Sequence, residues 1–309
     1  RPYFRTMMRS GPSASPLSDT APALAVVAFT LGVVTLTLLA SFLSGRPVGS
    51  DLVLHVGVSA LLGVVVLGAA RIAGEEARTL VTAVTVVGVM FFLYASLGRV
   101  AFAAIPWIGD PWLRAADRVL GLGAEPVLWV NRWLAAHAWS TEALSVFYGA
   151  FIPYIYLTIF LGLVARPRES RRVFILAFAI LYGVSFMGYL FVPARGPVVF
   201  MEDAFASPLQ GGFFHGIILT SIEGVGGPHG AFPSLHVGAS VLGMAFDFRH
   251  GDRLRGLIYV PLVLLISLAT LALRYHYLVD LVFGAAFAFG ALVLAERWTA
   301  RRVETGRAP

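Results

Sequence analysis

The sequence predicts an all-α, polytopic membrane helix bundle with about eight transmembrane helices. Of its 309 residues, 58% are hydrophobic and only 13% are charged, whereas soluble domains carry about 25% charged residues. Several apolar stretches reach the roughly twenty residues that a helix needs to cross a bilayer. The predicted spans are residues 21–43, 51–72, 79–97, 141–165, 173–192, 233–248, 256–273 and 277–298. The sixth is short, which indicates a helix partly surrounded by protein.

The remaining terminal segments add no second domain. Residues 1–20 are polar and rich in Ser and Pro, and we expect them to be disordered or in part an expression remnant. The apolar run that follows is longer than the about 7–15 residues of a signal-peptide core, which favours a retained first span. Residues 21–298 are predicted to form a single transmembrane domain, and residues 299–309 a basic cytoplasmic tail.

The arginines predict the orientation in the membrane. All 23 basic residues are arginine, and cytoplasmic loops of membrane proteins are enriched in such residues. With the N-terminus in the cytoplasm, sixteen arginines fall on the cytoplasmic side and seven on the outer side, and the loops 165–172 and 249–255 are especially basic. We therefore expect an integral protein of the plasma or inner membrane with both termini cytoplasmic. These loops explain the net charge of +6, so no nucleic-acid partner is indicated.

Two longer segments are expected on the outer face. Residues 98–140 hold scattered charges and the tryptophans Trp107, Trp112, Trp129, Trp133 and Trp139. Such a stretch is typical of short helices that lie at the level of the lipid headgroups, and the alternative is a cover that admits a substrate. Residues 193–232 are rich in Gly and Pro. Because they lead into the first motif described below, we expect them to form part of a roof over the site.

The first motif is the segment Phe232-Pro233-Ser234-Leu235-His236 at the start of the sixth span. Proline is favoured in the first turn of a helix, and the free amides of a helix N-terminus form a ready anion site. The hydroxyl of Ser234 adds a donor, and His236 can hold a proton for a leaving oxygen. The alternative interpretation is a helix cap with an incidental histidine.

The second motif is His276 and Asp280 at the start of the last span. Side chains four residues apart lie on one face of a helix, and ionisable groups at membrane depth are costly and often mark function. An aspartate bonded to one imidazole nitrogen fixes the tautomer and aims the other nitrogen outward. This is the orienting principle of a catalytic triad, with histidine as the nucleophile. The alternative is a buried polar pair that only ties helices together.

A phosphate bound at these two motifs needs cations, and the chain has no lysine. The fork of an arginine guanidinium suits phosphate oxygens, and Arg195 and Arg274 are the outer arginines nearest in sequence to the motifs. For Arg274 the alternative is an interfacial arginine that reaches toward headgroups. His215 and His229 are expected to be loop residues rather than catalysts. The absence of cysteine excludes thiolate catalysis and cysteine metal sites.

Together the two motifs resemble a known family. Pro-Ser-x-His followed by His-x-x-x-Asp, each at the outer start of a helix, resembles the type 2 phosphatidic acid phosphatase superfamily. The forms Phe-Pro-Ser-Leu-His and His-Tyr-x-x-Asp are more similar to its inositol phosphorylceramide synthase-like branch. The resemblance implies that His276 forms a phosphohistidine, that Asp280 orients it, that His236 protonates the leaving group and that Ser234 contacts the phosphate. It implies no metal or organic cofactor.

The sequence departs from the family pattern at the expected cations. The superfamily has a lysine ahead of an Arg-Pro pair, whereas here Gly196 separates Arg195 from Pro197. Its third motif has Ser-Arg, with the arginine six residues before the histidine. Here Ala269 and Thr270 occupy those positions. These departures concern the phosphate clamp and leave the His/His/Asp core intact.

The favoured function is a lipid phosphatase or phosphotransferase that acts through phosphohistidine. Its expected partners are the membrane, a lipid phosphate substrate and an acceptor, which is water, a polyol or a lipid alcohol. One alternative is a polyprenyl phosphate or diphosphate phosphatase. A second is a metal-dependent enzyme with a two-histidine, one-carboxylate site formed by His236, His276 and Asp280. A third is a transporter with an intramembrane His/Asp relay.

Overall fold

The computed structural model describes residues 20–72, 74–224 and 227–305, and no strand occurs among them. The predicted disordered segment, apart from Thr20, lies outside the described residues. Seven of the described helices are long and apolar enough to cross a membrane, which confirms the predicted all-α polytopic bundle. They are α1 (Ala21–Leu43), α2 (Gly49–Ala69), α3 (Glu75–Ala104), α6 (Ala138–Val164), α7 (Arg168–Phe191), α11 (Arg253–Ala272) and α12 (Leu278–Thr305).

The sixth predicted span differs from the other seven. It corresponds to α10 (Leu235–His250), whose 16 residues measure about 24 Å at 1.5 Å per residue. This helix is shorter than the rest, and α6, α7, α11 and α12 surround it. It runs beside α12, where Arg249 near its end pairs with Glu296 at 2.6 Å. So α10 reaches between the two ends of the bundle while being covered mostly by protein.

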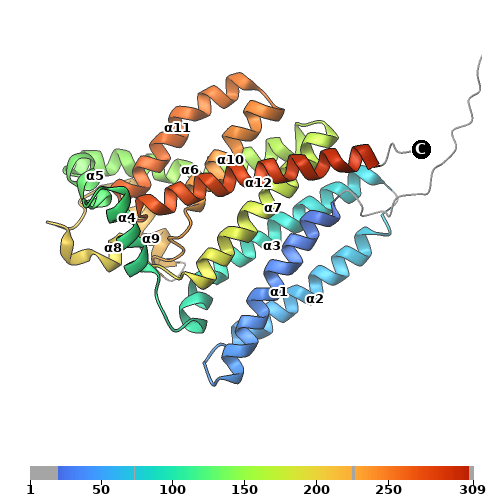
Figure 1. Ribbon diagram of the computed structural model, residues 1–309, viewed down its shortest axis with the longest axis horizontal. Helices are drawn as coiled ribbons and strands as arrows, with labels where there is room; N and C mark the ends of the chain where they lie inside the picture. The colour runs from blue at the N-terminus through green and yellow to red at the C-terminus, as the bar shows by residue number, and fades with distance from the viewer. Residues whose placement is uncertain (1–19, 73, 225–226, 306–309) are drawn as a thin grey trace, which may run out of the picture.

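Helix α7 lies at the centre of the molecule (Figure 1). Most of this helix is buried, because α1 and α3 pack on one part of its surface and α6, α10 and α12 on another. Gly183 brings α7 close to α1, since a Cβ at this position would lie 3.0 Å from the Thr30 hydroxyl. The N-terminal helices α1–α3 also pack on one another. They form a layer beside the rest of the bundle, which includes α10 and α12, the two helices that carry the motifs.

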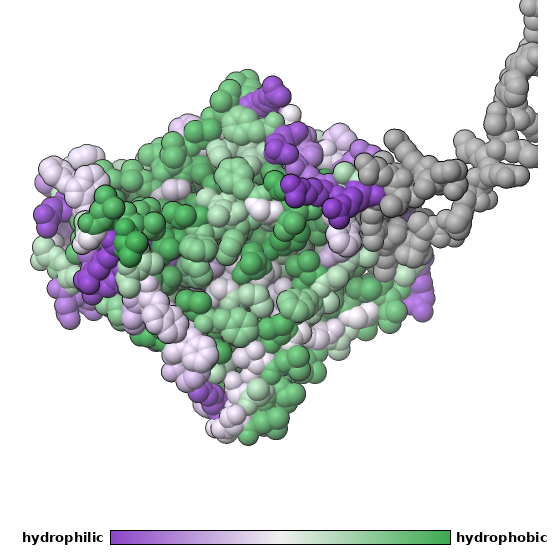
Figure 2. All heavy atoms as spheres, in the orientation of Figure 1, coloured by the Kyte–Doolittle hydropathy of each residue, from purple (hydrophilic) through white to green (hydrophobic). Residues whose placement is uncertain are grey.

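Ion pairs tie together the helix ends at one pole of the bundle. Asp247 of α10 is bound by Arg166 and Arg255 from the ends of neighbouring helices. Glu296 of α12 accepts hydrogen bonds from Arg249 and lies 2.7 Å from the His250 ring nitrogen. Figure 2 shows hydrophilic residues gathered toward the ends of the molecule, with a broad hydrophobic surface between them. This distribution fits helices whose middle portions face lipid.

The short helices gather at the opposite end, near the starts of α10 and α12 (Figure 1). They are α4 (Asp110–Leu120), α5 (Pro126–Leu134), α8 (Pro197–Phe200), η1 (Glu202–Ala204) and α9 (Phe213–Gly224). Helices α4 and α5 confirm the predicted Trp-rich helical segment, and its five tryptophans are 44% to 73% exposed. At the other end of the chain, α12 continues to Thr305. Helical structure therefore extends into the segment predicted as a tail.

Candidate active site

The starts of α10 and α12 are joined through Ser234. Its backbone N–H donates to the carbonyl of Asp280 at 3.0 Å, and its hydroxyl accepts from the backbone N–H of Val237 at 3.4 Å as the cap of α10. Pro233 thus lies before the cap rather than in the first helical turn, and the Ser234 amide is occupied rather than free. The hydroxyl proton of Ser234 is not needed for the cap. It can be donated to an anion.

The close approach of the two helices requires a glycine. A Cβ at Gly284 would overlap the carbonyl oxygen of Ser234. One turn further along α10, a Cβ at Gly238 would meet the Gly284 carbonyl at 3.1 Å. These contacts let the two helix starts, each carrying one motif, lie side by side.

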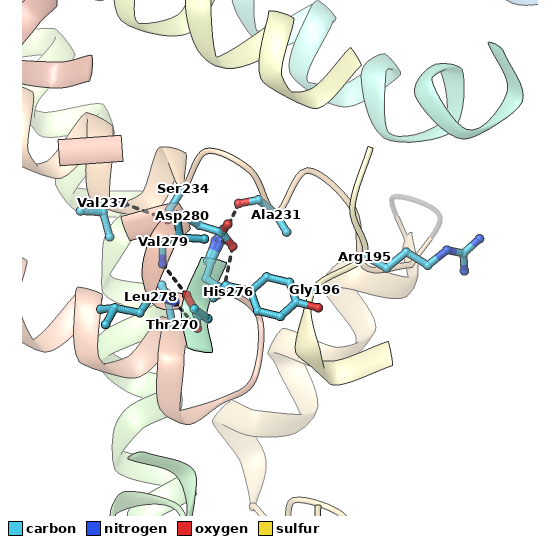
Figure 3. A network of polar contacts seen from close by, with 12 residues as sticks. Arg195, Gly196, Ala231, Ser234, Val237, Thr270, His276, Leu278, Val279 and Asp280 are labelled. Carbon is cyan, nitrogen blue, oxygen red and sulfur yellow. Dashed lines mark hydrogen bonds and ion pairs between the residues drawn. The ribbon is translucent and has the colours of Figure 1, made fainter. Parts of the chain in front are cut away.

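His276 is held by two acceptors on the same ring nitrogen (Figure 3). Its Nδ1 lies 2.8 Å from the carbonyl oxygen of Ala231 and 3.4 Å from Oδ2 of Asp280. Because both partners are acceptors, Nδ1 carries the hydrogen, and in the neutral ring Nε2 keeps its lone pair. Nε2 has no hydrogen-bond partner within the described part of the chain. The sequence indicated Asp280 as the orienting group, and the closer Ala231 carbonyl was missed.

Asp280 serves its own helix as well as His276. Its Oδ2 accepts the backbone N–H of Tyr277 at 2.8 Å, which satisfies one of the free amides at the start of α12. Its Oδ1 is buried and has no hydrogen-bond partner among the described residues. The side chain is fully buried. A positive charge that develops on the His276 ring therefore has a carboxylate acceptor next to it.

His236 faces His276 across a short gap. The two ring centroids are 5.8 Å apart and the rings are inclined at 65°. His236 is packed between Tyr148 and Phe151, with ring centroids at 4.5 and 4.4 Å. One phosphoryl group between the two imidazoles can contact both. The structure thus brings together Ser234, His236, His276 and Asp280.

A pocket with about 480 Å³ of empty space, part of it open to solvent, lies against these histidines. Its polar lining consists of tyrosines, histidines and one arginine: Tyr94, Tyr148, Tyr189, Tyr275, His229, His236, His276 and Arg195. No carboxylate is among the described residues that line it. The lining is therefore suited to an anion that also carries hydroxyl or apolar groups.

Arg195 is the cation of this pocket, and its guanidinium does not contact the histidines. The side chain is exposed, and its guanidinium carbon lies 4.9 Å from the centre of the Phe102 ring. In Figure 3 the Arg195 side chain extends away from His276. Among the described residues Arg195 forms no ion pair, and an exposed arginine held on an aromatic face can reorient toward a phosphate at low cost.

Arg274 lies in a different place from the one that its sequence position suggested. It is buried, and a terminal nitrogen donates to Asn131 Oδ1 at 3.1 Å and to the Ser207 carbonyl at 2.8 Å. Its guanidinium covers the ring of Phe205, and burial lowers the pKa of this group. It lines a second pocket together with His215. His236 and His276 line the first pocket, and Arg274 lines the second, with Tyr275 in both linings. The structure therefore does not bring Arg274 together with the two histidines.

Two buried carboxylates of α4 support the site and were missed from the sequence. Asp110 accepts the backbone N–H groups of Arg195 and Gly196 at 3.0 and 2.8 Å and the Tyr277 hydroxyl at 3.2 Å. Asp117 accepts the backbone N–H groups of Leu278 and Val279. Burial raises the pKa of both carboxyls, and the donated N–H groups oppose this rise. Both aspartates lie on one face of α4 together with Leu113. Their spacing in the sequence was the signal that could have identified this face.

Replacing Asp117 with alanine is expected to lower both stability and turnover. The change leaves the first amides of α12 without their acceptor, and loss of such a cap costs about 0.5–2 kcal/mol. Turnover falls because the same turn carries His276 and Asp280. Asp252 is a matched control, since it caps α11 at the opposite end by accepting from Leu254 and Arg255. Thermal unfolding in detergent and activity are measured for both alanine variants.

The Asp252 variant is expected to lose stability with turnover per folded molecule unchanged. Equal turnover of folded Asp117→Ala and wild-type protein would contradict the supporting role of Asp117.

Comparison with known proteins identifies the family. A sequence model of the PAP2 superfamily matches residues 111–294. No curated protein and no solved structure matches the chain. The matched region covers more than half of the chain and contains both motifs and the helices that carry them, while α1–α3 lie outside it. The chain belongs to the PAP2 superfamily, whose members are phosphatases.

Proposed function

We propose that this protein is an integral membrane enzyme that cleaves a lipid phosphoester through a phosphohistidine on His276. The observation that carries the proposal is the hydrogen bonding of that ring. With Nδ1–H donated to the Ala231 carbonyl and close to Asp280, the lone pair of Nε2 is available beside the pocket, and His236 lies 5.8 Å away between ring centroids. Family membership supports a phosphatase or phosphotransferase of lipid phosphoesters at the level of the reaction class.

In the first half of the reaction, Nε2 of His276 attacks phosphorus and the bond to the leaving oxygen breaks. His236 donates a proton to that oxygen, and Asp280 with the Ala231 carbonyl stabilises the charge on the phosphorylated ring. The hydroxyl of Ser234 and a reoriented Arg195 supply donors to the phosphate oxygens. A phosphate role for Arg274 requires its guanidinium to leave Asn131 and Ser207.

In the second half, an acceptor takes the phosphoryl or phospho-headgroup from His276. Water gives a phosphatase, and a polyol or lipid alcohol gives a phosphotransferase of the inositol phosphorylceramide synthase-like type. The site lies at the end of the bundle opposite the arginine-rich helix ends. This supports a cytoplasmic location for both termini and an extracytoplasmic site.

The proposal is tested with a panel of lipid donors presented to the purified protein in detergent. Phosphatidic acid, a phospholipid with a polyol headgroup and a polyprenyl diphosphate are each supplied with and without glycerol or ceramide as acceptor, and products are identified by mass spectrometry. Each reaction is run with and without a chelator. We expect chelator-resistant cleavage of at least one donor. Turnover that requires an added divalent cation, or the absence of cleavage for every donor, would contradict the proposal.

A further inference from the structure

The loop before α10 contributes a third histidine to the pocket. His229 lines the same pocket as His236 and His276. Its Nδ1 lies 2.7 Å from the carbonyl of Gly227, so Nδ1 carries the hydrogen and Nε2 keeps its lone pair. Nε2 has no hydrogen-bond partner among the residues that the structure describes. Burial lowers the pKa of this imidazole, which favours the neutral, proton-accepting form.

Helix α3 holds His229 in place through the absence of a side chain at Gly98. A Cβ at Gly98 would overlap Cδ2 and Nε2 of the His229 ring. Tyr94 and Phe102, four residues before and after Gly98, lie on the same helical face. Tyr94 lines the pocket and Phe102 lies under the Arg195 guanidinium. One face of α3 therefore forms a wall of the candidate site.

The other side of α3 is fixed by polar contacts with α2. Arg99 forms an ion pair with Asp51 of α2 at 2.7 Å, and the Ser96 hydroxyl contacts the His55 ring at 3.2 Å. These contacts set the rotation of α3, and with it the position of Gly98. Helix α3 lies outside the residues that match the family. The wall that α3 contributes thus lies outside the matched region, whereas His229 lies within it.

We infer that His229 is a further catalytic residue, whose Nε2 accepts the proton of the hydroxyl group that takes the phosphoryl group from His276. The inference rests on the proposed function. As the acceptor oxygen bonds to phosphorus, the bond between phosphorus and Nε2 of His276 breaks and its electron pair returns to that nitrogen. The acceptor proton passes to Nε2 of His229 and then to solvent. His236 serves the first half of the reaction, and His229 serves the second.

The test separates the two halves in the full-length protein, with 4-nitrophenyl phosphate as donor and water as acceptor. His229→Ala is expected to release one equivalent of nitrophenolate at the wild-type rate and then to turn over about a hundredfold more slowly, since general base catalysis contributes about 10²–10⁴-fold. Added imidazole is expected to restore part of the second phase. Gln at this position restores nothing, because an amide does not accept the proton.

A slower first phase in His229→Ala, or a steady-state rate within about twofold of wild type, would overturn the inference and leave the proposed role of His276 standing. If wild-type protein instead turns over without forming phosphohistidine, the proposed function fails, and the inference fails with it. The two failures are therefore distinct.

A glycine pair on α3 provides a second, independent test. Gly98→Ala displaces the Nε2 edge of His229 and is expected to reproduce the slow second phase. Gly88→Ala on the same helix is the matched control, because a Cβ there has nothing within 4 Å. The double variant Gly98→Ala/His229→Ala should be no slower than His229→Ala alone, since both changes remove one interaction. Additive losses in the double variant would contradict the inference that Gly98 acts through His229.

Discussion

Replacing His276 with asparagine is expected to abolish turnover while the fold is retained. The amide nitrogen of asparagine can donate to the Ala231 carbonyl as Nδ1 does at 2.8 Å, but asparagine has no counterpart of Nε2. The covalent route is therefore closed with little change in the local hydrogen bonding. Loss of a covalent catalyst typically costs far more than a hundredfold. Turnover is measured on a phosphoester donor and normalised to the folded fraction seen in thermal unfolding.

His250→Ala is the matched histidine control for this experiment. His250 pairs with Glu296 at the opposite end of the bundle, so its loss is expected to leave turnover close to wild type. Folded His276→Asn protein that retains more than about one-hundredth of the wild-type rate would exclude His276 as the nucleophile. His276→Ala gives a second measurement of the loss of turnover, because this variant also removes the contact with the Ala231 carbonyl.

Replacing His236 with alanine is expected to reduce turnover according to the leaving group. An alkoxide is strongly basic and needs a proton as it leaves, whereas nitrophenolate is stable without one. We expect a loss of about 10²–10⁴-fold in kcat/KM for an alkyl phosphoester and only a few-fold loss for a nitrophenyl phosphoester. The measurement compares the two donors with the same preparations of wild-type and variant protein.

A variant of the neighbouring Tyr148 serves as the control for this experiment. Tyr148→Phe keeps the ring that lies 4.5 Å from His236 and removes only the hydroxyl, so it is expected to lower both donors equally if it has any effect. Equal losses for the alkyl and nitrophenyl donors in His236→Ala would count against an acid role for this histidine.

The spans were predictable because each contains an apolar run of near-bilayer length. The prediction of α1 matches its observed bounds, Ala21–Leu43. Helix α3 extends further than the predicted span, to Ala104. Charged residues near its two ends form ion pairs, so the helix continues beyond its apolar run. Helix α10 is short for a span, and neighbouring helices cover it instead of lipid. Its short apolar run already indicated this difference.

The part of the candidate site on two helix starts was predictable from residue spacing. Ser234, His236, His276 and Asp280 converge because α10 and α12 begin side by side. The contribution of Ala231 was not predictable, because a backbone carbonyl has no signature in the side-chain pattern. Arg274 lies near His276 in sequence, but its contact with Asn131 of α5 draws it into another pocket.

The supporting carboxylates were hidden for a different reason. Asp110 and Asp117 lie in a segment whose tryptophans indicated a surface position, and acidic residues there are normally assigned to solvent. Both are buried because they accept backbone N–H groups from the loop at Arg195 and from the start of α12. Their seven-residue spacing, with Leu113 on the same face, was the available signal.

Trapping the phosphorylated protein tests the central claim most directly. Wild-type protein is mixed with an excess of 4-nitrophenyl phosphate and quenched in alkali within the first turnover, because phosphohistidine is labile in acid. Peptides are then mapped by mass spectrometry. The account predicts phosphate on the imidazole of His276, and none in His276→Asn. Phosphate on another residue, or steady turnover with no modified peptide at any time point, would contradict it.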